Sequence, residues 1–142
     1  MALETITDAE KHIIENIGKT FEAKPAEYGA DALARLFIIH PGSKAYFSYD
    51  ENNLEKLKNH GKKVVSALAD AAKNLNNLKC NLDKLATKHG KELLVDPQNF
   101  PVFSSCIQVT LANSQENFSP SVQLAVDKFL KAVNEYLSSK YR

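Results

Sequence analysis

The sequence has few cysteines, no long basic runs and no long apolar stretches. Cys80 and Cys106 are its only cysteines, too few for a disulfide framework and without the CxxC spacing of a metal site, so both are predicted to be reduced thiols. No basic run exceeds Lys62 and Lys63, and the net charge is +1, so neither nucleic acid nor an anionic membrane is expected as a partner. No segment approaches the roughly 18 apolar residues of a membrane span, and the first ten residues do not resemble a signal peptide.

The chain is nevertheless rich enough in apolar residues, 44%, for a full-sized core, and its 142 residues suggest a single domain spanning 1–142. Apolar side chains recur at helical spacing along most of the sequence, and no convincing strand can be read. The predicted fold class is therefore all-α, with helices that cross at large angles. The expected helices begin at the Thr7–Glu10 capping box, at Pro25, near residue 54, at an Asn81 cap, at Asp96-Pro97 and at Ser119-Pro120. Pro41-Gly42 is expected to end the second helix, and residues 43–53 to form a loop. The long helix is expected to cover roughly 54–76, and the helix that Asn81 caps is expected to end at His89.

Two of the four histidines lie on apolar helix faces. His12 and His40 fit a helix surface and a helix end, whereas His60 and His89 each point where the apolar residues of their own helix point. A lone inward histidine is more often a core residue bonded to a carbonyl, and a histidine at a helix C-terminus also interacts favourably with the helix dipole. Two such histidines on two helices instead indicate a dry pocket with two imidazoles facing each other.

Several chemistries do not suit this pair. Zinc needs three or four protein ligands, and no carboxylate or thiol shares these faces. There is no nucleophile elbow for a hydrolytic triad and no glycine-rich loop for a phosphate. A flat apolar cofactor with a central metal fits best, because haem iron takes one axial imidazole while a second can address a ligand on the opposite side.

Five segments of the chain carry a family resemblance. They read "EYGADALARLF", "HPGSKAYF", "KNHGKKV", "HGKELLVDPQNFP" and the terminal "SSKYR", and the similarity extends from about Thr7 to Arg142. The chain resembles the globin family, and within it the α-type chains of vertebrate tetrameric haemoglobins. The resemblance implies a globin fold, with six to eight helices around a haem pocket.

The resemblance also implies a set of site residues. His89 is similar to the proximal histidine that binds iron, and His60 to the distal histidine that reaches the metal through bound oxygen. Phe47 resembles the phenylalanine that packs on the haem, and Lys63 a lysine near a propionate. The other matches to haem-pocket positions are Leu36, Val64, Leu68, Leu85, Leu93, Val95, Asn99, Phe100 and Leu137.

The function that the resemblance implies is reversible oxygen transport by haem b (iron protoporphyrin IX), without enzymatic activity. Carbon monoxide and nitric oxide would bind too, and the partners would be β-type chains in an α2β2 tetramer in the red-cell cytoplasm. Two alternatives stay open: a globin that acts as nitrite reductase, peroxidase or nitric oxide dioxygenase, and a haem-free helical interaction module. The chain departs from common α chains between Phe47 and His60, where the connection is about two residues shorter and Tyr49 is the candidate for a missing aromatic residue.

Overall fold

The structure, a computed structural model, describes residues 5–89, 98–114 and 118–139. Within these ranges it is built from helices, and no residue belongs to a strand, which confirms the all-α prediction. The α-helices are α1 (Asp8–Ala23), α2 (Pro25–Ile39), α3 (Leu54–Lys73), α4 (Leu78–Thr87), α5 (Asn99–Ser114) and α6 (Pro120–Ser138), and the 3-10 helices η2 (Pro41–Tyr46) and η3 (Leu75–Asn77) lie between them.

Two helix starts follow the predicted capping chemistry. At α1 the Thr7 hydroxyl accepts from the Glu10 N–H at 3.1 Å, and the Glu10 carboxylate accepts from the Thr7 N–H at 2.9 Å, a complete capping box. At α6 the Ser119 hydroxyl accepts from the Val122 N–H at 3.3 Å. Both caps satisfy amide groups that have no partner inside the helix.

The prediction for the long helix was wrong at its C-terminal end. Helix α3 ends at Lys73, three residues before the expected boundary, and η3 follows. At this end the Asn74 side chain donates to the Asp70 carbonyl at 2.7 Å and so occupies an acceptor of the last turn.

The prediction for the next helix was also wrong at its start, and only its α-helical part ends before the expected residue. Helix α4 already begins at Leu78, and Asn81 does not cap it, because the Asn81 amide donates to the Asp70 carboxylate at 2.7 Å. The helix ends at Thr87, two residues before His89. Residues 88 and 89 continue as a π-helical turn.

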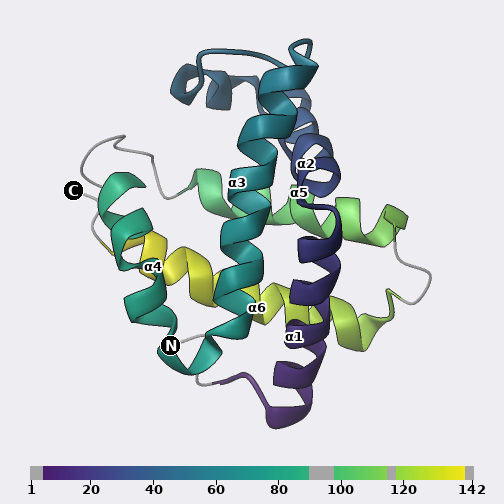
Figure 1. The fold of residues 1–142 in the computed structure, drawn as a ribbon, viewed down its shortest axis with the longest axis vertical. Coiled ribbons are helices and arrows are strands. Elements are labelled where there is room, and N and C mark those ends of the chain that lie inside the picture. Colours follow the sequence, from purple (N-terminus) through teal and green to yellow (C-terminus); the bar gives the residue numbers. More distant parts are fainter. Residues whose placement is uncertain (1–4, 90–97, 115–117, 140–142) are drawn as a thin grey trace.

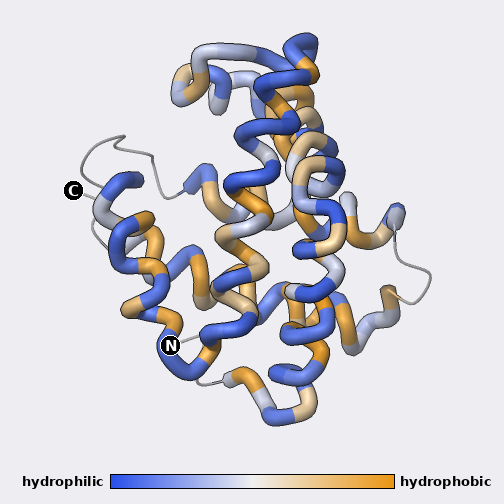
Figure 2. The backbone as a smooth tube through the Cα atoms, in the orientation of Figure 1, coloured by the Kyte–Doolittle hydropathy of each residue, from blue (hydrophilic) through white to orange (hydrophobic). Residues whose placement is uncertain are grey.

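The helices cross at large angles, as expected. Figure 1 shows α3 along the long axis of the molecule, with α5 and α6 running across it. Each helix alternates hydrophilic and hydrophobic positions along the tube in Figure 2, so one side of each is available to the core. The largest fully buried side chains come from α1, α2, α3, α4, α5 and α6 alike: Ile14, Phe21, Leu33, Phe37, Leu57, Val65, Leu78, Leu82, Ile107, Leu111, Val126 and Phe129.

Helices α2 and α3 approach each other closely at two glycines. A Cβ atom added to Gly29 would stand 2.1 Å from the Gly61 carbonyl oxygen, so the two backbones meet where neither residue has a side chain. Gly61 directly follows His60 in the sequence. The crossing therefore sets how close His60 lies to α2.

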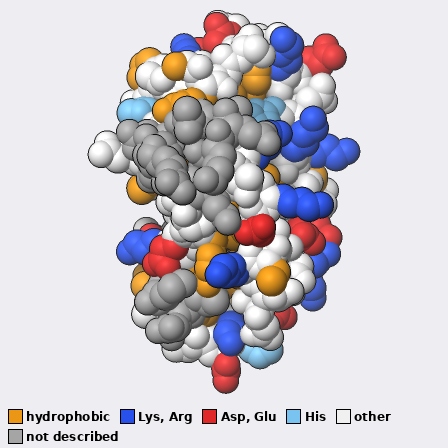
Figure 3. Space-filling model, turned by 90° about the vertical axis from the view of Figure 1, so that its left-hand side faces the viewer, with side chains coloured by type: hydrophobic (Ala, Val, Ile, Leu, Met, Phe, Trp, Pro, Cys, Tyr) orange, Lys and Arg blue, Asp and Glu red, His pale blue; other side chains and the backbone are white. Residues whose placement is uncertain are grey.

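Other sequence predictions concern thiols and the surface. Cys80 is exposed, Cys106 is buried, and both are free, which confirms two unpaired thiols. Burial raises the pKa of the Cys106 thiol. Among the helices that the structure describes, none has the length and apolar character to cross a bilayer. On the face seen in Figure 3, basic and acidic side chains are interspersed.

Candidate functional site

His89 lies two residues beyond the end of α4, with its ring partly buried. Its Nδ1 atom is 2.8 Å from the Leu85 carbonyl oxygen, and its ring centroid is 5.7 Å from that of Phe100. A carbonyl oxygen only accepts hydrogen bonds, so Nδ1 carries a proton, and in the neutral ring Nε2 is left with a free lone pair. A histidine whose other nitrogen is held by a carbonyl in this way is prepared to bind a metal.

His60 lies in the second turn of α3 and is also partly buried. Its Nδ1 atom is 2.6 Å from the Tyr49 hydroxyl, and its ring centroid is 5.2 Å from that of Phe47. Phe47 in turn packs edge-on against buried Phe37 at 4.9 Å. His60 is therefore held by two aromatic residues from the connection that precedes its helix.

The electrostatic surroundings of His60 favour its neutral form. Burial lowers the pKa of the His60 imidazole, and the nearby basic side chains of Lys63, Lys88 and His89 lower it further. The contribution of His89 means that the two histidines lie within electrostatic reach of each other, although they come from different helices. A neutral imidazole can donate one hydrogen bond and accept one.

The predicted lining residues fall into a buried and a half-buried group. Leu36 and Leu68 are buried, at 5% and 9% exposure. Five apolar residues are half-buried: Phe47, Val64, Leu85, Phe100 and Leu137. Of these, Phe47, Leu85 and Leu137 pack against the core. Phe47 lies beside His60, and Leu85 and Phe100 lie beside His89, so these residues offer an apolar wall to a flat apolar ligand.

Four predicted residues are exposed, take another position or fall outside the described ranges. Lys63 is exposed. The Asn99 amide oxygen lies 3.1 Å from Nε2 of His40, which places Asn99 against the C-terminal end of α2. Leu93 and Val95 lie outside the residues that the structure describes.

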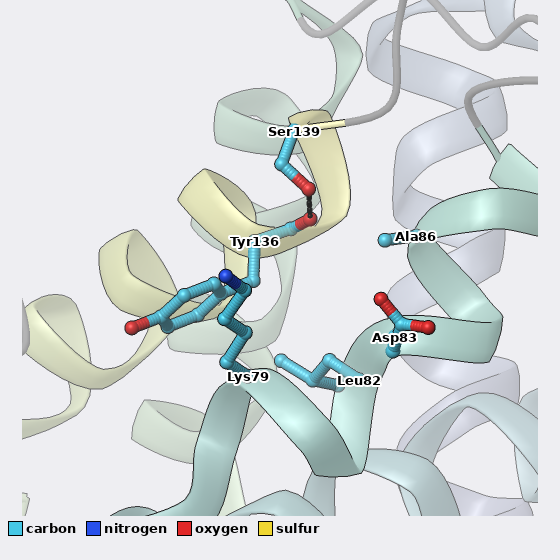
Figure 4. Close-up of a pocket in the computed structure, with 6 residues that line it drawn as sticks. All are labelled: Lys79, Leu82, Asp83, Ala86, Tyr136 and Ser139. Carbon is cyan, nitrogen blue, oxygen red and sulfur yellow. Dashed lines mark hydrogen bonds between the residues drawn. The ribbon is translucent and has the colours of Figure 1, made fainter.

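Two cavities in the described residues are lined by neither His60 nor His89. One, of about 170 Å³, separates α4 from the end of α6 and is lined by Lys79, Leu82, Asp83, Ala86, Tyr136 and Ser139. Figure 4 shows the Ser139 hydroxyl bonded to the Tyr136 carbonyl at its rim, a bond of 2.7 Å. The other, of about 320 Å³, is lined by His40, Gly42, Tyr46, Gln98, Asn99 and Val102.

The donor set limits which metal group the two histidines suit. Within residues 5–89, 98–114 and 118–139, no three His, Cys, Asp or Glu side chains come together as a metal site. A single imidazole with a free Nε2 suits a metal whose other positions are filled by a non-protein ligand, such as a porphyrin. The histidine pair and the apolar wall thus fit haem better than a bare ion.

Comparison with known proteins identifies the family. The chain belongs to the globin family, whose model matches residues 30–137. It is 49% identical over 138 residues to the haemoglobin α subunit of Mustelus griseus, covering 96% of this chain and 98% of that one. It is also 49% identical over 141 residues to the haemoglobin α subunit of Hemitrygon akajei, covering 96% and 99%.

Solved structures agree with this assignment. The deoxy haemoglobin of Dasyatis akajei matches with a TM-score of 0.93 and 49% identity over 97% of this chain and 100% of that one. The haemoglobin of the shortfin mako, Isurus oxyrinchus, matches with a TM-score of 0.93 and 48% identity over 97% and 100%. The predicted globin fold is confirmed.

Two features of the site were not foreseen from the sequence. One is the Tyr49–His60 hydrogen bond, which joins a connecting segment to a helix across 11 residues. Helical spacing gives no signal for such a pair, although Tyr49 was noted as a substitute aromatic residue. The other is the Gly29–Gly61 contact, for which two glycines inside strongly helical segments were the only sign.

Proposed function

We propose that this chain binds haem b and carries oxygen reversibly as an α-type haemoglobin subunit. One observation carries the proposal: Nδ1 of His89 is tied to the Leu85 carbonyl, which leaves Nε2 for iron. The 49% identity to haemoglobin α subunits over nearly the full chain supports it.

The residues that would hold haem follow from their chemistry. His89 is the proposed axial ligand, and Phe47, Val64, Leu85, Phe100 and Leu137 are the proposed apolar contacts, with Leu36 and Leu68 behind them. Exposed Lys63 is a proposed partner for a propionate, and Leu93, Val95 and Asn99 complete the proposed set. Ferrous haem, when bound by these residues, would supply reversible binding of a small diatomic ligand.

His60 is proposed to act on the ligand and not on the iron. Its ring is neutral at physiological pH because burial and neighbouring positive charges lower its pKa. An N–H of this ring can stabilise a ligand that gains negative charge, as oxygen does, and helps carbon monoxide less. The apolar contacts exclude water, which protects the ligand from proton-driven loss. Nitric oxide would bind as well.

The relatives suggest a carrier with β-type partners and no enzymatic activity. We propose an α2β2 tetramer in the red-cell cytoplasm, with residues 1–142 as one globin domain. Large apolar side chains on the end of α2 and on α5 support a partner surface: Ile38 is 65% exposed, Ile39 61% and Val109 44%. Arg35, a residue of α2 that pairs with Asp31, is proposed to join the same α–β contact.

The first test of this function removes the axial ligand. His89→Gly should lose most haem affinity and its Soret absorption, and added imidazole should restore the spectrum. His12→Gly, which replaces an exposed histidine on α1, is the matched control and should keep the wild-type spectrum. An unchanged spectrum in His89→Gly would rule out this residue as the ligand.

The second test measures oxygen binding by the chain alone and mixed with a β-type chain. The chain alone should bind oxygen with little cooperativity, as a monomer or weak dimer. The mixture should give a cooperative curve and a tetramer by sedimentation. A stable, cooperative homotetramer would contradict the need for a second chain type.

A further inference from the structure

Tyr49 is the residue closest to His60 that the carrier function leaves unexplained. Its hydroxyl oxygen lies 2.6 Å from Nδ1 of His60, with the two rings edge-to-face at 6.0 Å. Its own ring packs edge-on against Phe37 and against Phe47, each with centroids 5.7 Å apart. The phenol is therefore fixed on its ring side, and its hydroxyl is aimed at one nitrogen of one histidine.

The direction of this hydrogen bond follows from the two groups. A phenol is a good donor, and the lone pair of a neutral imidazole nitrogen is a better acceptor than a phenol oxygen. Burial raises the pKa of Tyr49 to about 12, so the hydroxyl keeps its proton. The favoured arrangement is thus O–H donating to Nδ1.

We infer that Tyr49 is a positioning residue that holds His60 in the tautomer protonated on Nε2, the nitrogen left free to donate to a bound ligand. The inference rests on the proposed oxygen-carrier function. If Nδ1 accepts from Tyr49, the single proton of the neutral ring must lie on Nε2. The opposite tautomer would present a lone pair, which repels a ligand carrying partial negative charge. Tyr49 thereby favours oxygen over carbon monoxide without touching either.

The test removes the hydroxyl and keeps the ring. Tyr49→Phe preserves the edge-on contacts with Phe37 and Phe47, and Tyr136→Phe, which removes a hydroxyl from α6, is the matched control. In the carbon monoxide form, which is diamagnetic, ¹⁵N NMR reports which nitrogen of His60 is protonated. The wild type and Tyr136→Phe should show a protonated Nε2 and a bare Nδ1, and Tyr49→Phe should show a mixture of both tautomers.

Ligand release gives a second readout. Tyr49→Phe should speed oxygen dissociation by about two- to tenfold, the range expected for one lost hydrogen bond, and should change carbon monoxide dissociation by less than about twofold. In a His60→Leu background the same substitution should have no effect on oxygen release. If Tyr49 had only a structural role, Tyr49→Phe would change oxygen release in the His60→Leu background as well. The double-mutant comparison therefore separates an effect through His60 from a structural effect.

Each outcome decides the inference. A wild-type His60 protonated on Nδ1 would overturn it, and this measurement needs no variant. Equal oxygen release in Tyr49→Phe and wild type, or an equal acceleration with and without His60, would overturn it too. A wild-type chain that does not bind haem or oxygen would instead refute the proposed function. If the wild type binds oxygen normally and Tyr49→Phe releases oxygen at the wild-type rate, only the role of Tyr49 is refuted and the proposed function stands.

Discussion

The contact between Gly29 and Gly61 makes a sharp prediction about the stability of the fold. A methyl group at position 29 would lie 2.1 Å from the Gly61 oxygen, 2.2 Å from its carbonyl carbon and 2.3 Å from its Cα. All three are backbone atoms, which cannot rotate out of the way. Helices α2 and α3 would have to separate by about 1.3 Å, the difference between 2.1 Å and the 3.4 Å at which ordinary contact begins.

The size of the effect can be estimated from two opposing contributions. Overpacking a core costs about 1–3 kcal/mol, and the upper end applies because the obstacle is backbone. Alanine also has the better helix propensity, which offsets about 1 kcal/mol. Gly29→Ala should therefore destabilise the chain by about 2 kcal/mol, equivalent to a fall in Tm of about 8 °C for a domain of this size.

The assay is thermal unfolding followed by far-UV circular dichroism, on the carbon monoxide form at fixed haem and protein concentrations. These must be fixed because a bound ligand raises apparent stability. Gly42→Ala in η2 is the matched control, since a Cβ atom there meets nothing within 4 Å. It should leave the Tm unchanged or raise it by an amount corresponding to about 0.4–1 kcal/mol. If Gly29→Ala and Gly42→Ala unfold at the same temperature, α2 and α3 can accommodate a methyl group at position 29, and the prediction is wrong.

Two further predictions concern a second helix contact and an ion pair. A Cβ on Gly18 would lie 2.8 Å from the Ala72 Cβ, so Gly18→Ala should lower the Tm. Adding Ala72→Gly should restore most of the lost Tm. If thermal unfolding shows no such rescue in the double variant, the two sites are independent. The hydrogen bond from Lys128 and the backbone N–H of Thr7 lower the pKa of Glu10, so its stabilisation is present above its ordinary pKa of 4.5 and lost as the pH falls through the lowered value. Glu10→Gln should therefore reduce the Tm at pH 7 but not in acid, and an equal reduction at both would contradict the assignment.

The helices themselves could largely be predicted because their signals are local. The capping box at Thr7 and the Ser119-Pro120 start each depend on residues within one turn, and both were correct. The end of α3 could not be predicted, because the apolar pattern continues to Leu75 while the backbone changes to a 3-10 turn at that residue. Asn81 was misread for a related reason: its side chain bonds to Asp70, which lies on another helix.

The candidate site was predictable to the extent that it lies on helix faces. His60 and His89 stay predicted site residues, indicated by the apolar faces on which they lie. The orientation of His89 could not be predicted, because the Leu85 carbonyl that fixes its tautomer leaves no pattern in side-chain spacing. Leu93 and Val95 stay predictions. Asn99 also stays a prediction, although its contact with His40 is a competing role that no helical pattern could have indicated.

The connection before α3, which the resemblance predicts to be about two residues shorter than in common α chains, is held by contacts of its own side chains. Lys44 and Glu51 form an ion pair of 2.7 Å across this segment, but both side chains are partly exposed, so the pair contributes at most about 1 kcal/mol. The Asn53 side chain accepts from the Lys56 N–H at 3.1 Å and starts α3 at a defined residue. Between these two contacts the ring of Tyr49 packs edge-on against Phe37 and Phe47, and each aromatic pair adds about 0.5–1.5 kcal/mol beyond burial. This packing restrains the position of the Tyr49 side chain. In this connection the Tyr49 hydroxyl lies 2.6 Å from Nδ1 of His60, and this contact is the one from which the tautomer of the imidazole is inferred.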